Sequence, residues 1–148
     1  MSYIVEIKGL ETLRKKLSPT QFTITKKQGM TNAVVFMEGK VKENTPFKKG
    51  ELRASWLPSV SEDGMEGRVT SRKEKASYGP YVEYGTGVYI GRGRIYPKKK
   101  KALAWDGMVR RSVAGQRGQF FVKRTWEAEG GVKLIRFFAN EINKQLES

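Results

Sequence analysis

Few residue types in this chain can carry acid-base or nucleophilic chemistry. Its 148 residues include no histidine and no cysteine. Histidine is the commonest general base and the commonest metal ligand, so its absence excludes serine-hydrolase triads and histidine-based zinc sites. Without cysteine, disulfides and thiolate metal sites are excluded as well. Any catalysis would therefore depend on carboxylates, lysines or tyrosines.

Three carboxylates, Glu51, Glu83 and Asp106, could serve a magnesium-dependent nuclease. Nothing in their spacing along the chain places them together. The glycines of residues 85–91 do not follow the dinucleotide-binding fingerprint, and the chain contains no phosphate-binding GxxxxGK[ST] motif. We therefore expect that the protein is not an enzyme and that it binds no cofactor and no metal ion. A magnesium-dependent nuclease is kept as a third, weaker hypothesis.

Residues 78–87 combine three tyrosines, one carboxylate and three glycines. The tyrosines are three apart, which places them along one face of a helical turn, and glycine permits the positive φ that ends such a turn. We expect the carboxylate to have a defined partner, either amides of the glycine turn or Arg53, because an unpaired buried charge is costly. An ordinary aromatic turn packed on the core would show the same pattern. The candidate interaction residues here are Tyr78, Tyr81, Glu83, Tyr84, Gly85 and Thr86.

The net charge of +14 is concentrated in one part of the chain. Between Tyr84 and Arg124, eleven lysines and arginines face a single acid, Asp106. This asymmetry predicts an acidic partner, either nucleic acid or an acidic protein surface. Tyrosines interleave with the cations, as in proteins that bind nucleic acid without reading its sequence, although a solvated charged face is an alternative. The candidate basic loop comprises Arg92, Arg94, Lys98, Lys99, Lys100 and Lys101.

Three elements are expected in the first third of the chain. Residues 3–8 are rich in β-branched side chains and predict a strand. Leucines at 10, 13 and 17 predict a short amphipathic helix that ends before Pro19. A long helix is expected over 20–44, ended by Pro46. Its apolar stripe is Met30, Val34, Met37 and Val41.

The remaining pattern alternates short strands with loops. A single helical turn within 51–56 leads into a hairpin of strands at about 55–60 and 65–71, because Glu62-Asp63-Gly64 is a turn signal. A solvated connection at 72–75, a mobile basic loop at 87–97 and a second hairpin of 101–105 with 108–113 follow. The last helix is expected over 132–146. Its predicted inward face is Ile135, Phe138, Ala139, Ile142 and Leu146.

The expected fold is therefore a single α+β domain over residues 1–148. A long helix from the N-terminal half and a C-terminal helix pack on one face of an antiparallel sheet, and a long basic loop is added to this framework. No apolar run approaches the roughly 20 residues that span a bilayer, and residues 1–6 do not resemble a signal peptide. We accordingly expect a soluble protein with no membrane partner.

Several of these segments, taken in order, resemble a family of tailed-phage and prophage proteins. Gly9, Leu10, Leu13 and Leu17 match its "GL..L...L" start. A "P...G.LR.S" turn and a "Y...vEyGT" segment follow. Lys49 stands where the family tends to have threonine, and the phenylalanines at 120–121 lack the proline that usually precedes them. The residues matching the turn and the later segment are Pro46, Gly50, Leu52, Arg53, Ser55, Tyr78, Val82, Glu83, Tyr84, Gly85 and Thr86.

The resemblance implies a structural role. Members of this family are tail completion, head-tail joining or minor capsid proteins of the phage neck, located at the head-proximal end of the tail. The implied partners are further copies in a ring of cyclic symmetry and other neck or tail proteins, such as a connector or stopper, a tail terminator or the tube. The implied location is the virion, reached from the host cytoplasm during assembly.

The leading hypothesis is therefore a ring component of the phage neck that completes the tail. In this hypothesis residues 84–101 contact other proteins or face the lumen, where non-specific DNA contact is possible. The alternative is a sequence-independent nucleic-acid-binding protein that uses the basic, glycine-rich loop. The third hypothesis is the nuclease.

Overall fold

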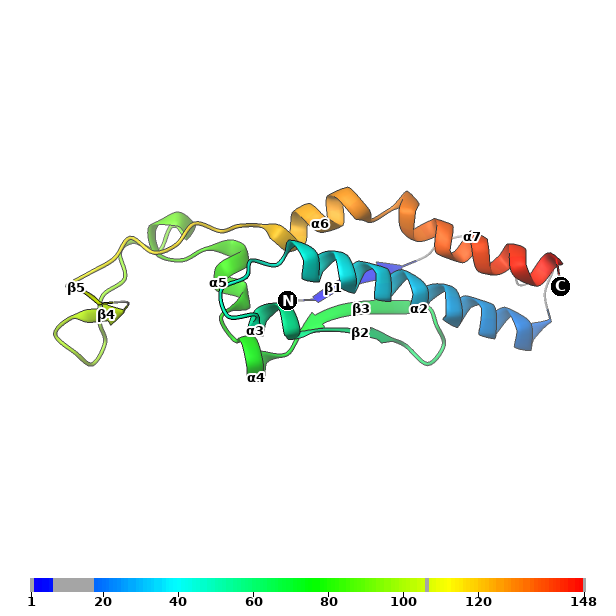
Figure 1. Ribbon diagram of the computed structural model, residues 1–148, viewed down its shortest axis with the longest axis horizontal. Helices are drawn as coiled ribbons and strands as arrows, with labels where there is room; N and C mark the ends of the chain where they lie inside the picture. The colour runs from blue at the N-terminus through cyan, green and yellow to red at the C-terminus, as the bar shows by residue number, and fades with distance from the viewer. Residues whose placement is uncertain (1, 7–17, 106, 148) are drawn as a thin grey trace. The chain divides into compact units, whose positions relative to one another are not determined.

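The computed structural model describes residues 2–6, 18–105 and 107–147. Its chain forms two compact units, which we call the body (Met1–Ala76 and Phe121–Ser148) and the ribbon (Ser77–Phe120). Figure 1 labels their elements. The helix expected at residues 10–17 and the carboxylate of Asp106 lie outside the described residues. The expectation that residues 1–148 form one domain stays a prediction.

The body contains a three-stranded antiparallel sheet in the order β1-β3-β2. Strand β3 (Glu66–Ser71) lies between β1 (Ser2–Glu6) and β2 (Trp56–Val60). The predicted hairpin of β2 and β3 is confirmed, with Pro58 opposite Val69. Its turn is closed by the amide of Gly64, which donates to the carbonyl of Ser61 at 3.0 Å. The pKa of Asp63 in this turn is lowered by hydrogen bonds from the Ser61 hydroxyl and the Met65 amide.

The predicted long helix is confirmed as α2 (Pro19–Asn44). Ser18 caps it through its hydroxyl oxygen, which accepts from the amide of Gln21, and proline occupies the first turn, where no backbone donor is lost. All four residues of the predicted apolar stripe are buried. The helix lies along the sheet, and β3 is close enough that a Cβ on Gly67 would be 2.2 Å from the Val34 side chain.

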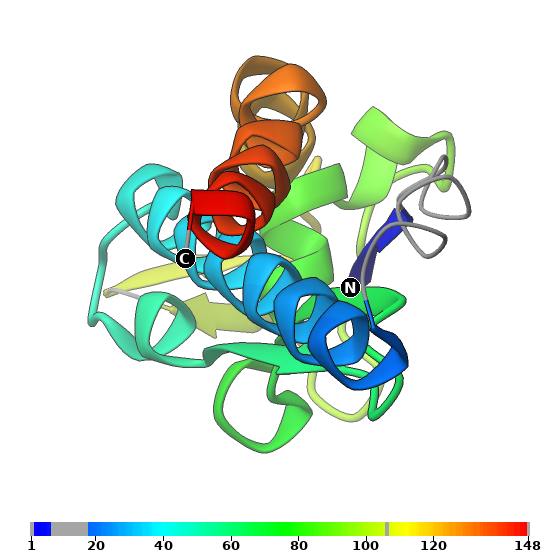
Figure 2. The same ribbon diagram turned by 90° about the vertical axis from the view of Figure 1, so that its right-hand side faces the viewer.

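Two C-terminal helices, α6 (Phe121–Glu129) and α7 (Val132–Glu147), pack on α2. Figures 1 and 2 both show α7 running beside α2. Gly29 allows this close approach, because a Cβ there would lie 2.8 Å from Cδ1 of Phe138. The antiparallel sheet, the long helix and the C-terminal helices together confirm the expected mixed fold.

The predicted inward face of α7 is wrong in part. Phe138 is buried as expected and Ile142 is half-buried, but Ile135 is 56% exposed and Ala139 is also exposed. Leu134 takes the inward position instead. The apolar residues of this helix cover one broad arc, so periodicity alone does not decide which part of that arc meets α2.

Two short helices flank the hairpin. The predicted turn after Gly50 is confirmed as α3 (Glu51–Ala54), whereas the solvated connection expected at 72–75 is instead the helix α4 (Lys73–Ala76). The helix α4 follows β3 after one residue, and the amide of Ala76 donates to the carbonyl of Arg72 at 3.1 Å. Among the described residues, no helix is both long and apolar enough to cross a membrane.

The ribbon consists of a short helix followed by two segments that pair with each other, which we call the first limb (residues 85–105) and the return limb (residues 107–120). The predicted aromatic turn is confirmed as α5 (Gly79–Tyr84). The hairpin predicted around Gly107 is confirmed as β4 (Leu103–Trp105) and β5 (Met108–Arg110). Regular structure in 87–97 was not expected, yet the first limb contains the 3-10 helix η1 (Gly87–Ile90) and the paired residue Ile95.

Candidate functional site

The first group of candidate residues forms the junction between α2 and β2 in the body. Thr45 ends α2, and its hydroxyl donates to the carbonyl of Val41 at 2.6 Å while accepting the indole N–H of Trp56 at 3.0 Å. Trp56 is fully buried, 6.2 Å edge-on from Phe121. Pro46 follows the cap at once, where a helix must stop. These contacts join the long helix, the sheet and α6 at one point.

Arg53 and its neighbours complete this junction. The guanidinium donates to the carbonyl of Thr45 at 3.1 Å and lies 5.3 Å from the centre of the Phe47 ring. Gly50 lies against the same ring and has a φ of +79°. Residues with a side chain rarely adopt this left-handed conformation.

The last two candidate residues of the turn also serve the junction. Leu52 is buried, and the Ser55 hydroxyl donates to the Leu52 carbonyl at 2.7 Å and is 2.9 Å from the Ser71 hydroxyl of β3. All of these bonds are internal to the body. The contacts of the residues in the "P...G.LR.S" turn are therefore those of residues that hold the body together.

The second group, in the ribbon, meets the return limb through main-chain hydrogen bonds. We call residues 82–88 and 113–120 together the limb junction. Amides of the first segment donate to carbonyls of the second, from Thr86 to Gln116 and from Val88 to Ala114, both at 2.8 Å. Amides of the second segment donate back, from Gln119 to Val82 at 2.9 Å and from Phe120 to Glu83 at 3.0 Å. The Thr86 hydroxyl also accepts the Gln116 amide at 2.9 Å.

Glycines occupy the closest crossings of the limb junction. A Cβ on Gly85 would lie 2.6 Å from the Gln116 carbonyl oxygen, and one on Gly87 would lie 2.1 Å from that of Ala114. Both have positive φ, of +91 and +64, as the sequence predicts. On the return limb, Gly115 and Gly118 approach Thr86 and Glu83 in the same way. Side chains are excluded here because backbone meets backbone.

The tyrosines of α5 are exposed. Tyr81 is 59% accessible, and Tyr78 and Tyr84 are exposed as well. Tyr84 stacks edge-on with Phe120 at 6.4 Å, across the limb junction. The tyrosines of α5 are therefore not packed on a core, as an ordinary aromatic turn would require. The side chain of α5 that is fully buried is that of Glu83.

The structure gives no support for a metal-binding cluster among the described carboxylates that a nuclease would need. Glu51 is an exposed residue of the body, Glu83 is a buried residue of the ribbon, and Asp106 lies outside the described residues. Among the residues that the structure describes, no three acidic, histidine or cysteine side chains are placed to hold a metal ion. The role of the buried Glu83 carboxylate as a brace of α5 stays a prediction.

We predict that Glu83→Gln lowers stability by about 1–3 kcal/mol if the partner of this fully buried carboxylate is cationic, because the amide keeps the shape of the side chain but loses the charge that pairs with that partner. Urea unfolding of the purified chain measures this change. Glu62→Gln, at an exposed carboxylate, is the control and should change stability by less than about 0.5 kcal/mol. A normally stable Glu83→Gln protein that had lost a magnesium-dependent plasmid cleavage would contradict the brace and support the nuclease.

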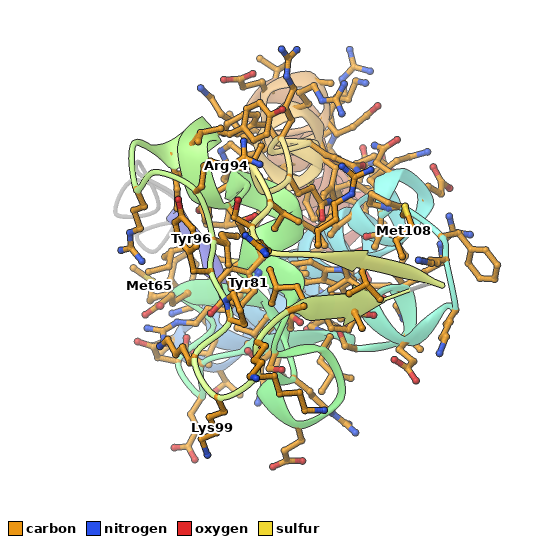
Figure 3. All side chains as sticks on the ribbon, turned by 90° about the vertical axis from the view of Figure 1, so that its left-hand side faces the viewer. Met65, Tyr81, Arg94, Tyr96, Lys99 and Met108 are labelled. Atoms are coloured by element: carbon orange, nitrogen blue, oxygen red, sulfur yellow. The ribbon has the colours of Figure 1, made fainter. Side chains whose placement is uncertain are left out.

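The basic loop is exposed at every residue from 92 to 101 except Pro97, which is half-buried. Arg92, Arg94 and the four lysines at 98–101 are all on the surface, and Figure 3 shows Arg94, Tyr96 and Lys99 on the same limb. Arg94 donates through Nε to the Ser112 hydroxyl at 2.9 Å, beside the pair formed by Ile95 and Val113. The loop expected to be mobile is thus partly fixed by the return limb.

The structure assigns the two sets of candidate residues to different units. Residues 46–55 form the junction within the body. In the ribbon, residues 83–86 lie in the limb junction, opposite a return limb that the sequence did not indicate, whereas Tyr78 and Tyr81 precede it. Gly115 and Gly118 belong to this junction, and their only signal in the sequence was a second glycine-rich segment.

Comparison with known proteins relates the chain to one family of bacteriophage proteins. A model of the family described as "Bacteriophage HK97-gp10, putative tail-component" matches residues 9–85, slightly more than half of the chain. No curated protein and no solved structure matches the chain significantly. The matched range includes the α2 to β2 junction and α5, and it ends where the first limb begins. The chain thus belongs to the HK97-gp10-like family of bacteriophage tail components.

Proposed function

We propose that the chain is a ring component of the phage neck, where it completes the tail and takes part in joining it to the head. In this role it is structural and not an enzyme. Its partners are further copies of itself and neighbouring neck or tail proteins, such as a connector or stopper, a tail terminator or the tube. The family supports a structural tail component, and the ribbon supports assembly into a multimer.

The observation that carries the proposal is that the described apolar side chains of the ribbon are exposed and not buried in a core. Among its described residues, no large apolar side chain is buried, whereas eleven large apolar or aromatic side chains are exposed. Patches of this kind mark interaction surfaces. The exposed side chains are Tyr78, Tyr81, Tyr84, Val88, Tyr89, Ile90, Ile95, Tyr96, Met108, Val109 and Phe120.

The ribbon is nevertheless ordered by its main chain. The hydrogen bonds of the limb junction, the pairing of Ile95 with Val113 and the β4-β5 ladder fix the two limbs against each other. A surface that is shaped before binding loses less conformational entropy on association. A second copy supplies the same surface in a repeated geometry, and repetition closes a ring when the rotation between copies is cyclic.

We expect the unmodified chain to form one multimer of uniform mass in native mass spectrometry, with rings visible by electron microscopy. Val109→Asp should weaken assembly by at least about tenfold, because it places a charge on a 71% exposed apolar position of the ribbon. Val132→Asp is the matched control, since Val132 is 70% exposed but belongs to the body, at the first residue of α7. An aspartate is tolerated at a helix start.

Two outcomes would contradict the proposal. One is a chain that stays monomeric at concentrations of tens of micromolar. The other is equal loss of assembly in Val109→Asp and Val132→Asp, which would mean that the ribbon has no special part in association.

A further inference from the structure

The cations of the ribbon differ from those of the body in their partners. In the body, five lysines on the helices are paired with glutamates one turn away, as in Lys40 with Glu43 and Lys133 with Glu129. The hydrogen bond that Lys40 donates to the Glu43 carboxylate raises the pKa of Lys40. Within the described residues, none of the nine lysines and arginines of the ribbon is joined to a carboxylate. They are Arg92, Arg94, Lys98, Lys99, Lys100, Lys101, Arg110, Arg111 and Arg117.

These cations come from both limbs and lie on a prearranged framework. The first limb carries six of them and the return limb three. The two limbs are held together by the Ile95–Val113 pair and by β4-β5, in which Leu103 stands opposite Arg110. Two arginines are also fixed individually, since Arg94 donates to Ser112 and Arg117 lies 5.4 Å from the centre of the Tyr89 ring. So many like charges on one small unit repel one another unless a polyanion is present.

We propose that the ribbon binds the phosphate backbone of nucleic acid without reading its sequence. Four consecutive exposed lysines are point charges on flexible stems, which suit a row of phosphates better than the fixed geometry of a few carboxylates. Tyr96 is 65% exposed between Arg94 and these lysines, in a position to stack on an unpaired base. The lysine row itself is not part of the exposed apolar set of the ribbon, although Tyr96 belongs to both, and the binding does not depend on the chain forming a ring.

The test uses the full chain and fluorescence anisotropy with three probes: a 30-base-pair DNA duplex, a single strand of the same length, and polyglutamate as an acidic polypeptide. The main variant replaces all four lysines, Lys98→Gln, Lys99→Gln, Lys100→Gln and Lys101→Gln. The control replaces four paired body lysines, Lys40→Gln, Lys42→Gln, Lys133→Gln and Lys144→Gln. Both variants lose the same formal charge, so an effect of total charge would be equal in the two. Thermal unfolding and native mass confirm that each variant folds and assembles as the parent does.

We expect the parent chain to bind duplex DNA with a Kd between about 10⁻⁴ and 10⁻⁶ M at physiological salt. The ribbon variant should bind at least about tenfold more weakly, and its slope of log affinity against log salt should be shallower by about 0.9 for each phosphate that it no longer neutralises. The body variant should keep both values close to those of the parent. Tyr96→Ala should weaken binding to the single strand and leave duplex binding unchanged, which distinguishes stacking from backbone contact.

Three results would overturn the proposal. Duplex and single-strand affinities both weaker than about 10⁻⁴ M at physiological salt would mean that no useful nucleic-acid site exists. Equal losses in the ribbon and body variants would show that only total charge matters. Polyglutamate binding as tight as duplex binding would assign the cations to an acidic protein surface instead.

Discussion

Replacing Gly87 with alanine is expected to separate the two limbs of the ribbon and to abolish assembly. A Cβ at this position would lie 2.1 Å from the carbonyl oxygen of Ala114, an atom that also accepts the amide of Val88 at 2.8 Å. Backbone cannot yield as a flexible side chain can, so the limbs must move apart. Hydrogen exchange should show protection of the Thr86 and Val88 amides falling by more than about tenfold, equivalent to about 1.4 kcal/mol.

Gly91→Ala is the matched control for this experiment. Gly91 has a similar φ, +74 against +64, but nothing lies within 4 Å of where its Cβ would be. Both variants incur the cost of about 1–2 kcal/mol for a side chain in the left-handed region, and only Gly87→Ala adds the clash. If the two variants lost protection at Thr86 and Val88 equally, the close crossing would not be what holds the limbs together.

The second large effect is expected at Trp56 in the body. Trp56→Ala should lower the free energy of unfolding by about 3–5 kcal/mol, because the side chain is fully buried where α2, β2 and α6 meet. Trp56→Phe should lower the free energy of unfolding by less, since phenylalanine keeps an aromatic ring at this position. The hydrogen bond lost in this variant is the one that the indole N–H donates to the Thr45 hydroxyl. Urea unfolding of both variants gives the two values.

Phe47→Ala provides the comparison for a large aromatic residue at the same junction. Phe47 is 69% exposed, so its removal should change stability by less than about 1 kcal/mol. A loss for Trp56→Ala no greater than that for Phe47→Ala would show that the junction of residues 45–56 is not the structural centre of the body.

The body could largely be predicted from the sequence, because its signals are local. The stripe of Met30, Val34, Met37 and Val41 predicts α2, and the turn at Glu62-Asp63-Gly64 predicts the β2-β3 hairpin. The inward side of α7 could not be predicted, because Gly29 on another helix decides where Phe138 fits. That contact joins residues more than a hundred positions apart.

The ribbon could be predicted only in its separate pieces. Three tyrosines with a glycine exit predict α5 and the positive φ of Gly85 and Gly87, and Gly107 predicts the β4-β5 turn. The limb junction left no periodic pattern, because it is made of main-chain bonds between residues 82–88 and 113–120. Phe120 likewise has a φ of +47, which nothing in the residue type suggests.

A second copy is expected to cover the exposed apolar surface of the ribbon, and this is the central claim about the protein. Its most direct measurement is photo-cross-linking in a mixture of copies with natural nitrogen and copies with ¹⁵N, with a benzoylphenylalanine in place of Tyr81. Tyr81 is 59% exposed on α5, and the same probe in place of Phe47 is the control in the body. We predict cross-linked peptides from position 81 that pair the two isotopes, because contacts between copies mix them. Cross-links from position 81 that only ever join peptides of the same isotope would contradict the claim.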